Sequence, residues 1–224
     1  MTANFTLSNS AQASGLACPA ADCPRCPRLV AFRKQNRFTH PDWHNGSVPS
    51  FGPLDARLLI VGLAPGLRGA NATGRPFTGD WAGHLLYSTL LAKGCARGVY
   101  GEQVDDGLQL IDCRITNAVR CVPPANRPMP AEVASCRPFL AREMAAMPRL
   151  QAVVALGGLA HDAVLASRDV KKAGFPFAHG ARHDLPNGLK LFDSYHCSRL
   201  NTNTGRLTEE MFHRVVTYAL SVLI

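Results

Sequence analysis

Four short apolar segments, separated by helical patterns, constrain the fold of this chain most strongly. Each has the length and composition of a buried strand; they are RLLIVGLA (57–64), CRITNAV (113–119), QAVVALG (151–157) and LKLFDSYH (189–196). Helical patterns lie between them and after the last, at 82–94, 130–147, 159–167 and 208–224. This alternation predicts an α/β protein, a three-layer α/β/α arrangement with a central, mainly parallel four-stranded sheet.

Two of the expected helices carry clear start signals. Pro130 and Glu132 lie in the first turn of the 130–147 helix, where proline and an acidic side chain are favoured. Thr208 is a suitable N-cap for the last helix, with Glu209 and Glu210 in its positive first turn. The sequence therefore predicts where these two helices begin.

The length of 224 residues is that of one ordinary domain. Residues 1–17 are polar and aperiodic, so we expect a flexible N-terminal tail followed by a single domain over 18–224. The chain has no signal-peptide pattern and no apolar run of membrane-spanning length. We therefore expect a cytoplasmic protein without a membrane partner, and a monomer.

The chain is basic although few of its residues are charged. Its formal net charge is +8, while only 18% of residues are Asp, Glu, Lys or Arg. Such an excess favours a polyanionic partner such as nucleic acid, although the charge alone does not decide between this and a merely basic soluble protein.

The unusual residues gather in loops that follow the expected strands. The loop GLAPGLRGANATGRPFTGD (62–80) is rich in glycine, and it has Ala64 at its turn, where a reacting acid would naturally lie. Further loops begin at Asn117, Gly157 and His196. Because parallel sheets bind ligands at the carboxyl ends of their strands, we expect these four loops to surround one site.

Four of the eight cysteines suit metal ligation. Cys23 and Cys26 form a CxxC pair close to an expected helical start, and Cys121 and Cys136 follow with fourteen residues between them. Four thiolates fit tetrahedral zinc or an iron-sulfur cluster, and the spacing does not decide between them. Redox chemistry is the other common use of a CxxC pair, and Cys18 is a less favoured substitute ligand.

The loops and cysteines together resemble a known family. The matching segments occur in the family's order and are GLAPG (62–66), TGRPFTGD (73–80), NAVRCVPPANRP (117–128), SCRPFL (135–140), VALGGLA (154–160) and SYHCSRLNTNTGRLT (194–208). They make the chain similar to the uracil-DNA glycosylase superfamily, and within it to the iron-sulfur branch called family 5. Family 4 is the nearer relative of family 5 within the superfamily. Family 4 carries an acid at the Ala64 position and family 5 an alanine. The resemblance implies a uracil-DNA glycosylase-like fold and a [4Fe-4S] cluster held by Cys23, Cys26, Cys121 and Cys136.

The resemblance also implies an activity and a partner. The activity is that of a monofunctional DNA glycosylase that hydrolyses the N-glycosidic bond of uracil and so initiates base excision repair. The space left by the small Ala64 motivates the further expectation that other deaminated or 5-substituted bases are excised as well. The partner is DNA that contains uracil or another damaged base. Such an enzyme must flip the target nucleotide out of the stack into a pocket. The residues expected to form the pocket are Gly62, Ala64, Pro65, Gly66, Phe77, Asn117 and His196.

Each pocket residue has an expected role and a simpler alternative. Phe77 would stack on the base, unless it is a core aromatic. Asn117 would read the pyrimidine edge, unless it is a structural cap. His196 would hydrogen-bond the base carbonyl as negative charge builds there, unless it is structural. Asn71 and Asp80 are the candidates to act on water or the sugar in place of the missing acid, and the sequence does not rank them.

The loop after His196 is the expected DNA-binding loop. Leu200 would insert into the vacated stack, and the polar residues around it would bind phosphates; these are Ser198, Arg199, Asn201, Thr202 and Thr204. The basic face could extend over Arg68, Arg75, Arg120 and Arg127. A solvated loop is the alternative. Cys197 departs from the superfamily, which commonly has proline after the histidine, so the rigidity of this loop is in question.

Two other classes of protein compete with this interpretation. An iron-sulfur redox or regulatory protein that binds nucleic acid would explain the thiols and the charge, but not the grouping of Phe77, Asn117 and His196. A phosphate-loop hydrolase is weaker, because GLAPGLRG lacks the Lys-Ser or Lys-Thr ending of a P-loop.

Overall fold

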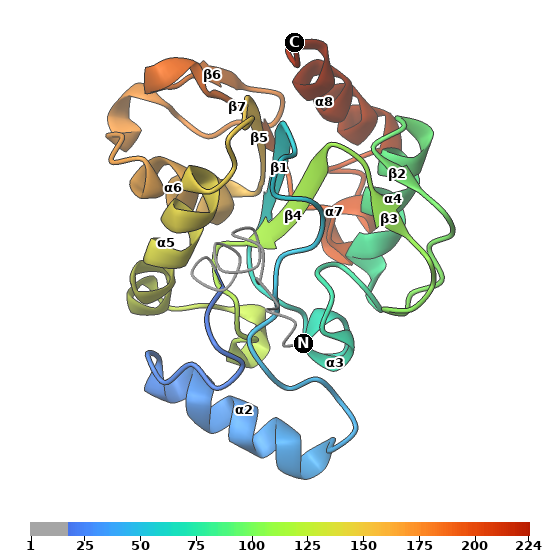
Figure 1. The fold of residues 1–224 in the computed structure, drawn as a ribbon, viewed down its shortest axis with the longest axis vertical. Coiled ribbons are helices and arrows are strands. Elements are labelled where there is room, and N and C mark those ends of the chain that lie inside the picture. Colours follow the sequence, from blue (N-terminus) through green and yellow to red (C-terminus); the bar gives the residue numbers. More distant parts are fainter. Residues whose placement is uncertain (1–17) are drawn as a thin grey trace, which may run out of the picture.

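The computed structural model describes residues 18–224, so the tail predicted over 1–17 lies outside the described residues. The predicted three-layer α/β/α arrangement is confirmed (Figure 1). All four predicted strands are present in a five-stranded sheet of order β4-β1-β5-β7-β6. The strands are β1 (Leu58–Gly62), β4 (Cys113–Asn117), β5 (Ala152–Leu156), β6 (Arg182–Asp184) and β7 (Lys190–Ser194).

The parallel pairing brings the strand ends to one edge. Gly62 at the end of β1 lies opposite Asn117 at the end of β4. In the next parallel pair of the same sheet, Leu156 at the end of β5 lies opposite Ser194 at the end of β7. The loops that follow these four strands therefore leave the sheet at the same edge, as their sequence order predicted.

The fifth strand, β6, is the difference from the predicted four-stranded sheet. It has three residues, Arg182, His183 and Asp184, and it pairs antiparallel with β7 at the edge of the sheet. None of the three is apolar, so a search for buried apolar runs cannot find it. A separate two-stranded ribbon, β2 (Ala96–Arg97) with β3 (Gln109–Leu110), is as short and was equally missed.

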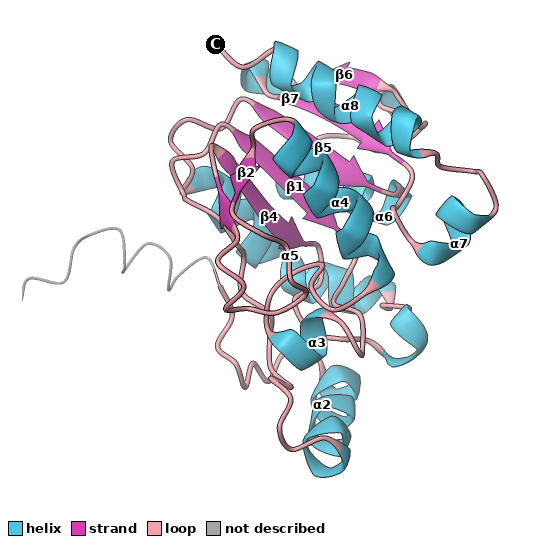
Figure 2. Cartoon of the chain, turned by 90° about the vertical axis from the view of Figure 1, so that its right-hand side faces the viewer, coloured by secondary structure: helices cyan, strands magenta, loops and turns pink. Residues whose placement is uncertain are grey.

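Two pairs of helices cover the faces of the sheet. Helices α4 (Trp81–Ala92) and α8 (Glu209–Ser221) cover one face, and α5 (Pro130–Ala145) and α6 (Gly158–Ser167) cover the other (Figure 2). Alternate residues of β1 point to opposite faces of the sheet. Ile60 packs in the core under α4 and α8, and Val61 packs in the core under α5 and α6. Burial on both faces explains why the strand sequences are continuous apolar runs.

The predicted helix starts are confirmed. Pro130 is the first residue of α5, and the Glu132 carboxylate accepts a 2.7 Å hydrogen bond from the backbone N–H of Met129. Thr208 caps α8, where its hydroxyl accepts a 3.2 Å hydrogen bond from the N–H of Met211. No helix of residues 18–224 combines the length and the apolar character needed to cross a membrane.

Helices α3 (Ala70–Thr73) and α7 (Arg199–Asn203) were not predicted, and of α2 (Pro27–Thr39) only a start close to the CxxC pair was expected. Helix α2 begins directly after Cys26 and lies apart from the sheet (Figure 1). Helices α3 and α7 have four and five residues, too few for an apolar period to appear in the sequence.

A buried polar group joins β7 to its neighbours. The Asp193 carboxylate of β7 pairs with His161 Nδ1 of α6 at 2.8 Å and with His183 Nε2 of β6 at 3.1 Å. His161 Nε2 also lies 2.8 Å from the carbonyl oxygen of Phe175. Burial opposes the charged form of His161, but the hydrogen bond and charge of Asp193 raise its pKa. The group therefore fixes β7 three residues before His196.

A second buried network joins α5 to β4. The Glu143 carboxylate of α5 accepts hydrogen bonds from Arg114 Nε at 2.7 Å, from Thr116 Oγ1 at 2.9 Å and from the Arg120 guanidinium. Arg120 also donates to Ser50 Oγ at 2.6 Å. Burial opposes ionisation of Glu143, but the charges of Arg120 and Arg114 outweigh it and lower the pKa of the carboxyl.

We predict that Glu143→Gln destabilises the fold by about 3–5 kcal/mol, because it leaves two buried guanidinium groups without their counter-charge. Urea denaturation of the variant and the wild type measures the difference. Glu210→Gln is the matched control, since Glu210 forms only an exposed ion pair with Arg214 in α8. It should cost less than about 0.5 kcal/mol. Equal stability of the two variants would contradict the role given to Glu143.

Candidate active site

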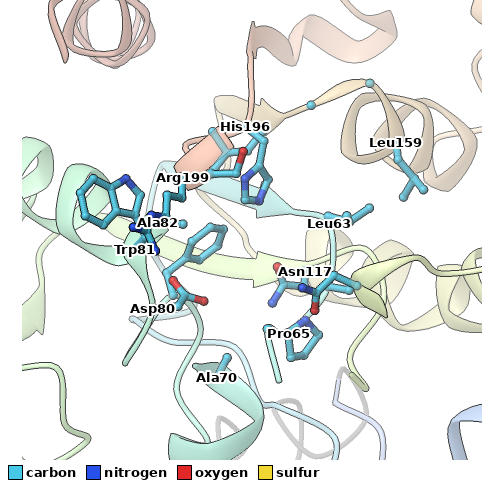
Figure 3. Close-up of a pocket in the computed structure, with 18 residues that line it drawn as sticks. Leu63, Pro65, Ala70, Asp80, Trp81, Ala82, Asn117, Leu159, His196 and Arg199 are labelled. Carbon is cyan, nitrogen blue, oxygen red and sulfur yellow. The ribbon is translucent and has the colours of Figure 1, made fainter. Parts of the chain in front are cut away.

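A cavity of about 470 Å³ lies at the carboxyl edge of the sheet (Figure 3). Most of the predicted site residues line it, namely Ala64, Pro65, Gly66, Phe77, Asp80, Asn117, His196, Ser198 and Arg199. The predicted residues outside its lining are Gly62, Asn71, Leu200 and Asn201. Lining residues that the sequence did not single out include Trp81, Asn126 and Leu159.

Asn117 presents an unsatisfied polar atom at this site. It is the last residue of β4 and only 3% exposed. Its Oδ1 is buried and accepts no hydrogen bond from the described part of the chain. Because an unpaired buried acceptor is costly, such an atom in a native structure calls for a partner. The side chain lies at the cavity, where a ligand could supply that partner (Figure 3).

Gly62 acts by the space it leaves free. A Cβ atom built on Gly62 would collide with Asn117 Oδ1 and would lie 2.5 Å from Phe77 Cζ. Glycine therefore lets the amide and the aromatic ring both pack against the end of β1. Phe77 has a left-handed backbone (φ 53°), which turns its ring into the cavity wall.

His196 completes the aromatic side of the cavity. It follows the end of β7, and its ring stacks on Phe77 with centroids 5.9 Å apart and planes at 28°. Burial lowers the pKa of His196 to about 4. The imidazole is therefore neutral near pH 7, with one ring nitrogen as a hydrogen-bond donor and the other as an acceptor.

Asp80 is held at the start of α4. As the N-cap, its Oδ1 accepts a hydrogen bond of 3.3 Å from the Gly83 N–H. Its Oδ2 lies against the glycine-rich loop, where a Cβ on Gly66 would lie 2.9 Å from it and one on Gly69 would be closer still. Burial raises the pKa of Asp80. Figure 3 shows Asp80, Asn117 and His196 on different sides of the same cavity.

Asn71, the other candidate beside Asp80, lies behind the cavity wall. It is fully buried in α3, and its Nδ2 donates a 2.9 Å hydrogen bond to Asn45 Oδ1. The backbone of Asn45 in turn donates to the Asn71 carbonyl at 3.0 Å. Of the two candidates left open by the sequence, Asp80 alone lines the cavity.

The predicted DNA-binding loop after His196 forms α7 at the mouth of the cavity. Ser198 is the N-cap of α7, and Leu200 on this helix is 73% exposed. The Asn201 amide points inward and donates a 2.8 Å hydrogen bond to the carbonyl oxygen of His196. Cys197 is fully buried and belongs to the core on the α4 and α8 side of the sheet. Its side chain thus anchors a loop that lacks the proline of the motif.

Two of the four arginines expected to extend the basic face are buried, so that expectation was wrong for them. Arg75 forms a two-pronged ion pair with Asp106, at 2.6 and 2.8 Å. Arg120 belongs to the Glu143 network. Both charges are satisfied inside the protein, whereas Arg68 and Arg127 are exposed.

The four candidate ligand cysteines line one small cavity, which we name the cysteine pocket. Cys26 is the N-cap of α2, and Cys23 lies three residues before it. Cys121 follows β4, and Cys136 lies in α5. Cys18 is not part of the lining. Backbone and side-chain donors face two of the sulfur atoms, since the N–H of Arg120 lies 3.4 Å from Cys136 Sγ and Arg33 Nη1 lies 3.6 Å from Cys121 Sγ.

The described residues also hold one group of three potential metal ligands outside the cysteine pocket, namely His161, His183 and Asp193, whose ligand atoms lie within 4.8 Å of one another. This group already forms the ion pairs that join β7 to its neighbours. The four cysteines that line the cysteine pocket are a donor set that suits an iron-sulfur cluster or a zinc ion.

Comparison with known proteins agrees with these features. The family model of the uracil DNA glycosylase superfamily matches residues 49–219. A type-5 uracil-DNA glycosylase of Thermus thermophilus is 44% identical over 202 residues, which cover 88% of this chain and 92% of that protein. A type-5 uracil-DNA glycosylase of Pyrobaculum aerophilum is 42% identical, with 88% of each chain covered.

A more distant relative helps to assign the branch. A type-4 uracil-DNA glycosylase of Pyrobaculum aerophilum is 34% identical over 156 residues, which cover 68% of this chain and 65% of that protein. The type-5 relatives therefore match at higher identity and over more of the chain. This chain belongs to the uracil-DNA glycosylase superfamily, in which it groups with the type-5 proteins.

Proposed function

We propose that this protein is a DNA glycosylase that hydrolyses the N-glycosidic bond of uracil in DNA. Its membership of the superfamily and the names of its type-5 relatives support the activity. The observation that carries it is the buried, unpartnered Asn117 Oδ1 in a cavity that also holds Phe77, Asp80 and a neutral His196. A volume of about 470 Å³ admits a single nucleotide base with its sugar.

Recognition of the flipped base follows from the shape and polarity of the cavity. The Phe77 ring gives the base a stacking surface. Uracil carries a donor at N3–H beside an acceptor at O4, and an amide offers the complementary acceptor and donor. Asn117 Oδ1 accepts from N3–H, which gives this buried oxygen the hydrogen bond it lacks.

Bond cleavage is assisted by the stabilisation of charge on the leaving base. As the bond between the sugar C1′ and the base N1 breaks, its electron pair moves to the base and the sugar becomes cation-like. The neutral His196 donates a hydrogen bond to the base oxygen on which negative charge builds. One such donor is worth roughly 3–4 kcal/mol of barrier, because it acts more strongly on the transition state than on the substrate.

Asp80 acts on the sugar side of the reaction. With Ala64 in the loop turn, no carboxylate stands there, and Asp80 is the acid that lines the cavity. Its ionised carboxylate stabilises the cation-like sugar and takes a proton from the water that adds to C1′. Asn71 has no carboxylate and does not line the cavity, and its Nδ2 is bound to Asn45, so we assign this step to Asp80 in preference to Asn71.

A [4Fe-4S] cluster in the cysteine pocket is part of the proposal. Cys23, Cys26, Cys121 and Cys136 would hold it, and the donors of Arg33 and Arg120 favour sulfur atoms that carry negative charge. When bound, the cluster supplies cross-links between distant segments and takes no part in the hydrolysis. It would join α2 to α5 and to the loop that leaves Asn117.

The remaining parts of the proposal concern the substrate and the assembly. Ser198 and Arg199 bind phosphates and the exposed Leu200 fills the vacated stack, while Asn201 holds the loop from inside. The small Ala64 leaves room for other deaminated or 5-substituted bases. Residues 18–224 act as one domain, in a monomer that resides in the cytoplasm and initiates base excision repair.

Cleavage of an oligonucleotide that carries one uracil, followed by alkali, tests the activity. We expect cutting at uracil only, and a loss of about 100- to 1,000-fold in kcat for His196→Ala. His40→Ala is the matched control, because His40 is exposed at the end of α2 and outside the cavity, and it should match the wild type. Absence of cutting at uracil by the wild-type protein would refute the activity and favour a redox or regulatory protein.

Asp80→Asn and Asn71→Ala should fail in different ways. Asp80→Asn lowers kcat by about 100-fold or more at an unchanged melting temperature, since it removes the base but keeps the shape. Asn71→Ala mainly lowers the melting temperature, since it leaves Asn45 Oδ1 unpaired in the core. The reverse pattern in the two variants would assign the step to Asn71.

The pH dependence of the wild type gives a further test of Asp80. The wild-type kcat should fall as the pH drops through the raised pKa of Asp80, because the protonated acid cannot take a proton.

Replacement of a proposed ligand tests the cluster without relying on activity. Cys26→Ala should lower the iron content and the visible absorbance of the purified protein and also its melting temperature. Cys95→Ala is the control, because Cys95 is a free, buried cysteine outside the cysteine pocket, and its iron content should match the wild type. Equal iron in both variants would exclude Cys26 as a ligand.

A further inference from the structure

Trp81 is a large aromatic residue that the fold leaves exposed beside the candidate active site. It is the first residue of α4, directly after Asp80, and it is 47% exposed. In Figure 3 it lies near Asp80 and Arg199, on the side of the cavity away from Leu159. Tryptophan is enriched at interaction surfaces, because it combines a large apolar ring with one polar N–H group.

The ring of Trp81 is held in place by two helices. Its Nε1–H donates a 2.8 Å hydrogen bond to Thr202 Oγ1 of α7. The Arg199 guanidinium lies 5.6 Å from the ring centroid, and the His84 ring meets it edge-on at 6.2 Å. The only polar atom of the indole is thus already paired. What the side chain offers to a partner is apolar, aromatic surface in a fixed orientation.

Trp81 contributes to two hollows. It lines the 470 Å³ cavity and also an open groove of about 790 Å³ along α4 and the start of α8. Tyr100, Leu85 and Leu207 line that groove as well. A strand whose flipped nucleotide fills the cavity must continue past its mouth, where Trp81 stands with the positive charge of Arg199 beside it.

We propose that Trp81 stacks on the base next to the flipped nucleotide and so binds the unpaired strand around the lesion. This inference rests on the proposed function. Stacking of a base on an aromatic side chain changes affinity by about 5- to 150-fold and tolerates any base sequence. Because the ring is already fixed by Thr202, little order is lost when a base stacks on it. Arg199 is positioned to pair with the phosphate that joins the two nucleotides.

The tryptophan content of the chain offers a direct test. Trp43 and Trp81 are its two tryptophans, and Trp43 stacks on His40 with ring centroids 3.8 Å apart. In Trp43→Phe, Trp81 is therefore the only indole. Titration with a single-stranded oligonucleotide that carries 2′-fluoro-deoxyuridine, which resists hydrolysis, should quench its fluorescence. The signal of Trp81→Phe, which comes from Trp43, should not change. Binding seen by fluorescence anisotropy without quenching in Trp43→Phe would overturn the proposal.

Kinetics give an independent test. Trp81→Ala should raise KM for a single-stranded uracil oligonucleotide by about 5- to 150-fold and change kcat by less than about threefold. The effect should disappear on a substrate truncated so that the uracil has no neighbour on one side. Thr202→Val removes the hydrogen bond but keeps the ring, so it should raise KM less than Trp81→Ala does.

The outcomes separate this inference from the proposed function. If the wild type excises no uracil, the proposed function fails. If the wild type excises uracil while Trp81→Ala keeps the wild-type KM on long and truncated substrates, only the role of Trp81 fails. A KM that rises equally on both substrates would indicate a structural role and would also overturn the stacking.

Discussion

The close approach of three residues at the ends of β1 and β4 is the constraint on which the site depends. The parallel register puts Gly62 opposite Asn117, and the absence of a side chain on Gly62 leaves room for Asn117 Oδ1 and the Phe77 ring against the strand. Any Cβ at that point would push both groups out of the cavity wall. The aromatic surface and the buried acceptor are therefore consequences of one glycine, which explains why a residue outside the lining matters as much as those within it.

The loop that leaves Asn117 is fixed from the side opposite the cavity. Arg120, three residues further on, enters the Glu143 network, and its N–H faces Cys136 in the cysteine pocket. His196 is fixed in the same manner, by the pairing of Asp193 on β7 with His161 and by the Asn201 amide on its carbonyl. Buried charges are costly, but here they hold two cavity residues on separate strands in a fixed relation. The stability of the fold and the geometry of the site thus depend on the same contacts.

The sequence predicts those parts of the molecule that leave a local pattern. The four long strands are continuous apolar runs, and the starts of α5 and α8 have Pro130 and Thr208 as local signals. Strand β6 and helices α3 and α7 leave none, because they are short and polar. Arg75 and Arg120 were misassigned to the surface, since their partners Asp106 and Glu143 are 31 and 23 residues away and only the folded chain shows the pairing. Trp81 was missed for a similar reason, as the contact that fixes it comes from α7.

The absence of an acid at Ala64 has a physical counterpart elsewhere in the cavity. Asp80 and His196 lie in the same cavity, and burial moves their pKa values in opposite directions, upward for the acid and downward for the imidazole. Both shifts have the same cause, because a buried site disfavours the charged form of either group. A neutral imidazole has a further advantage for a base that leaves as an anion. A charged imidazolium would also attract the DNA phosphates and stabilise the bound substrate. The hydrogen bond of a neutral donor, in contrast, becomes stronger mainly as negative charge develops on the leaving base. In the proposed reaction, burial of His196 would therefore favour selective stabilisation of the transition state over general attraction to DNA.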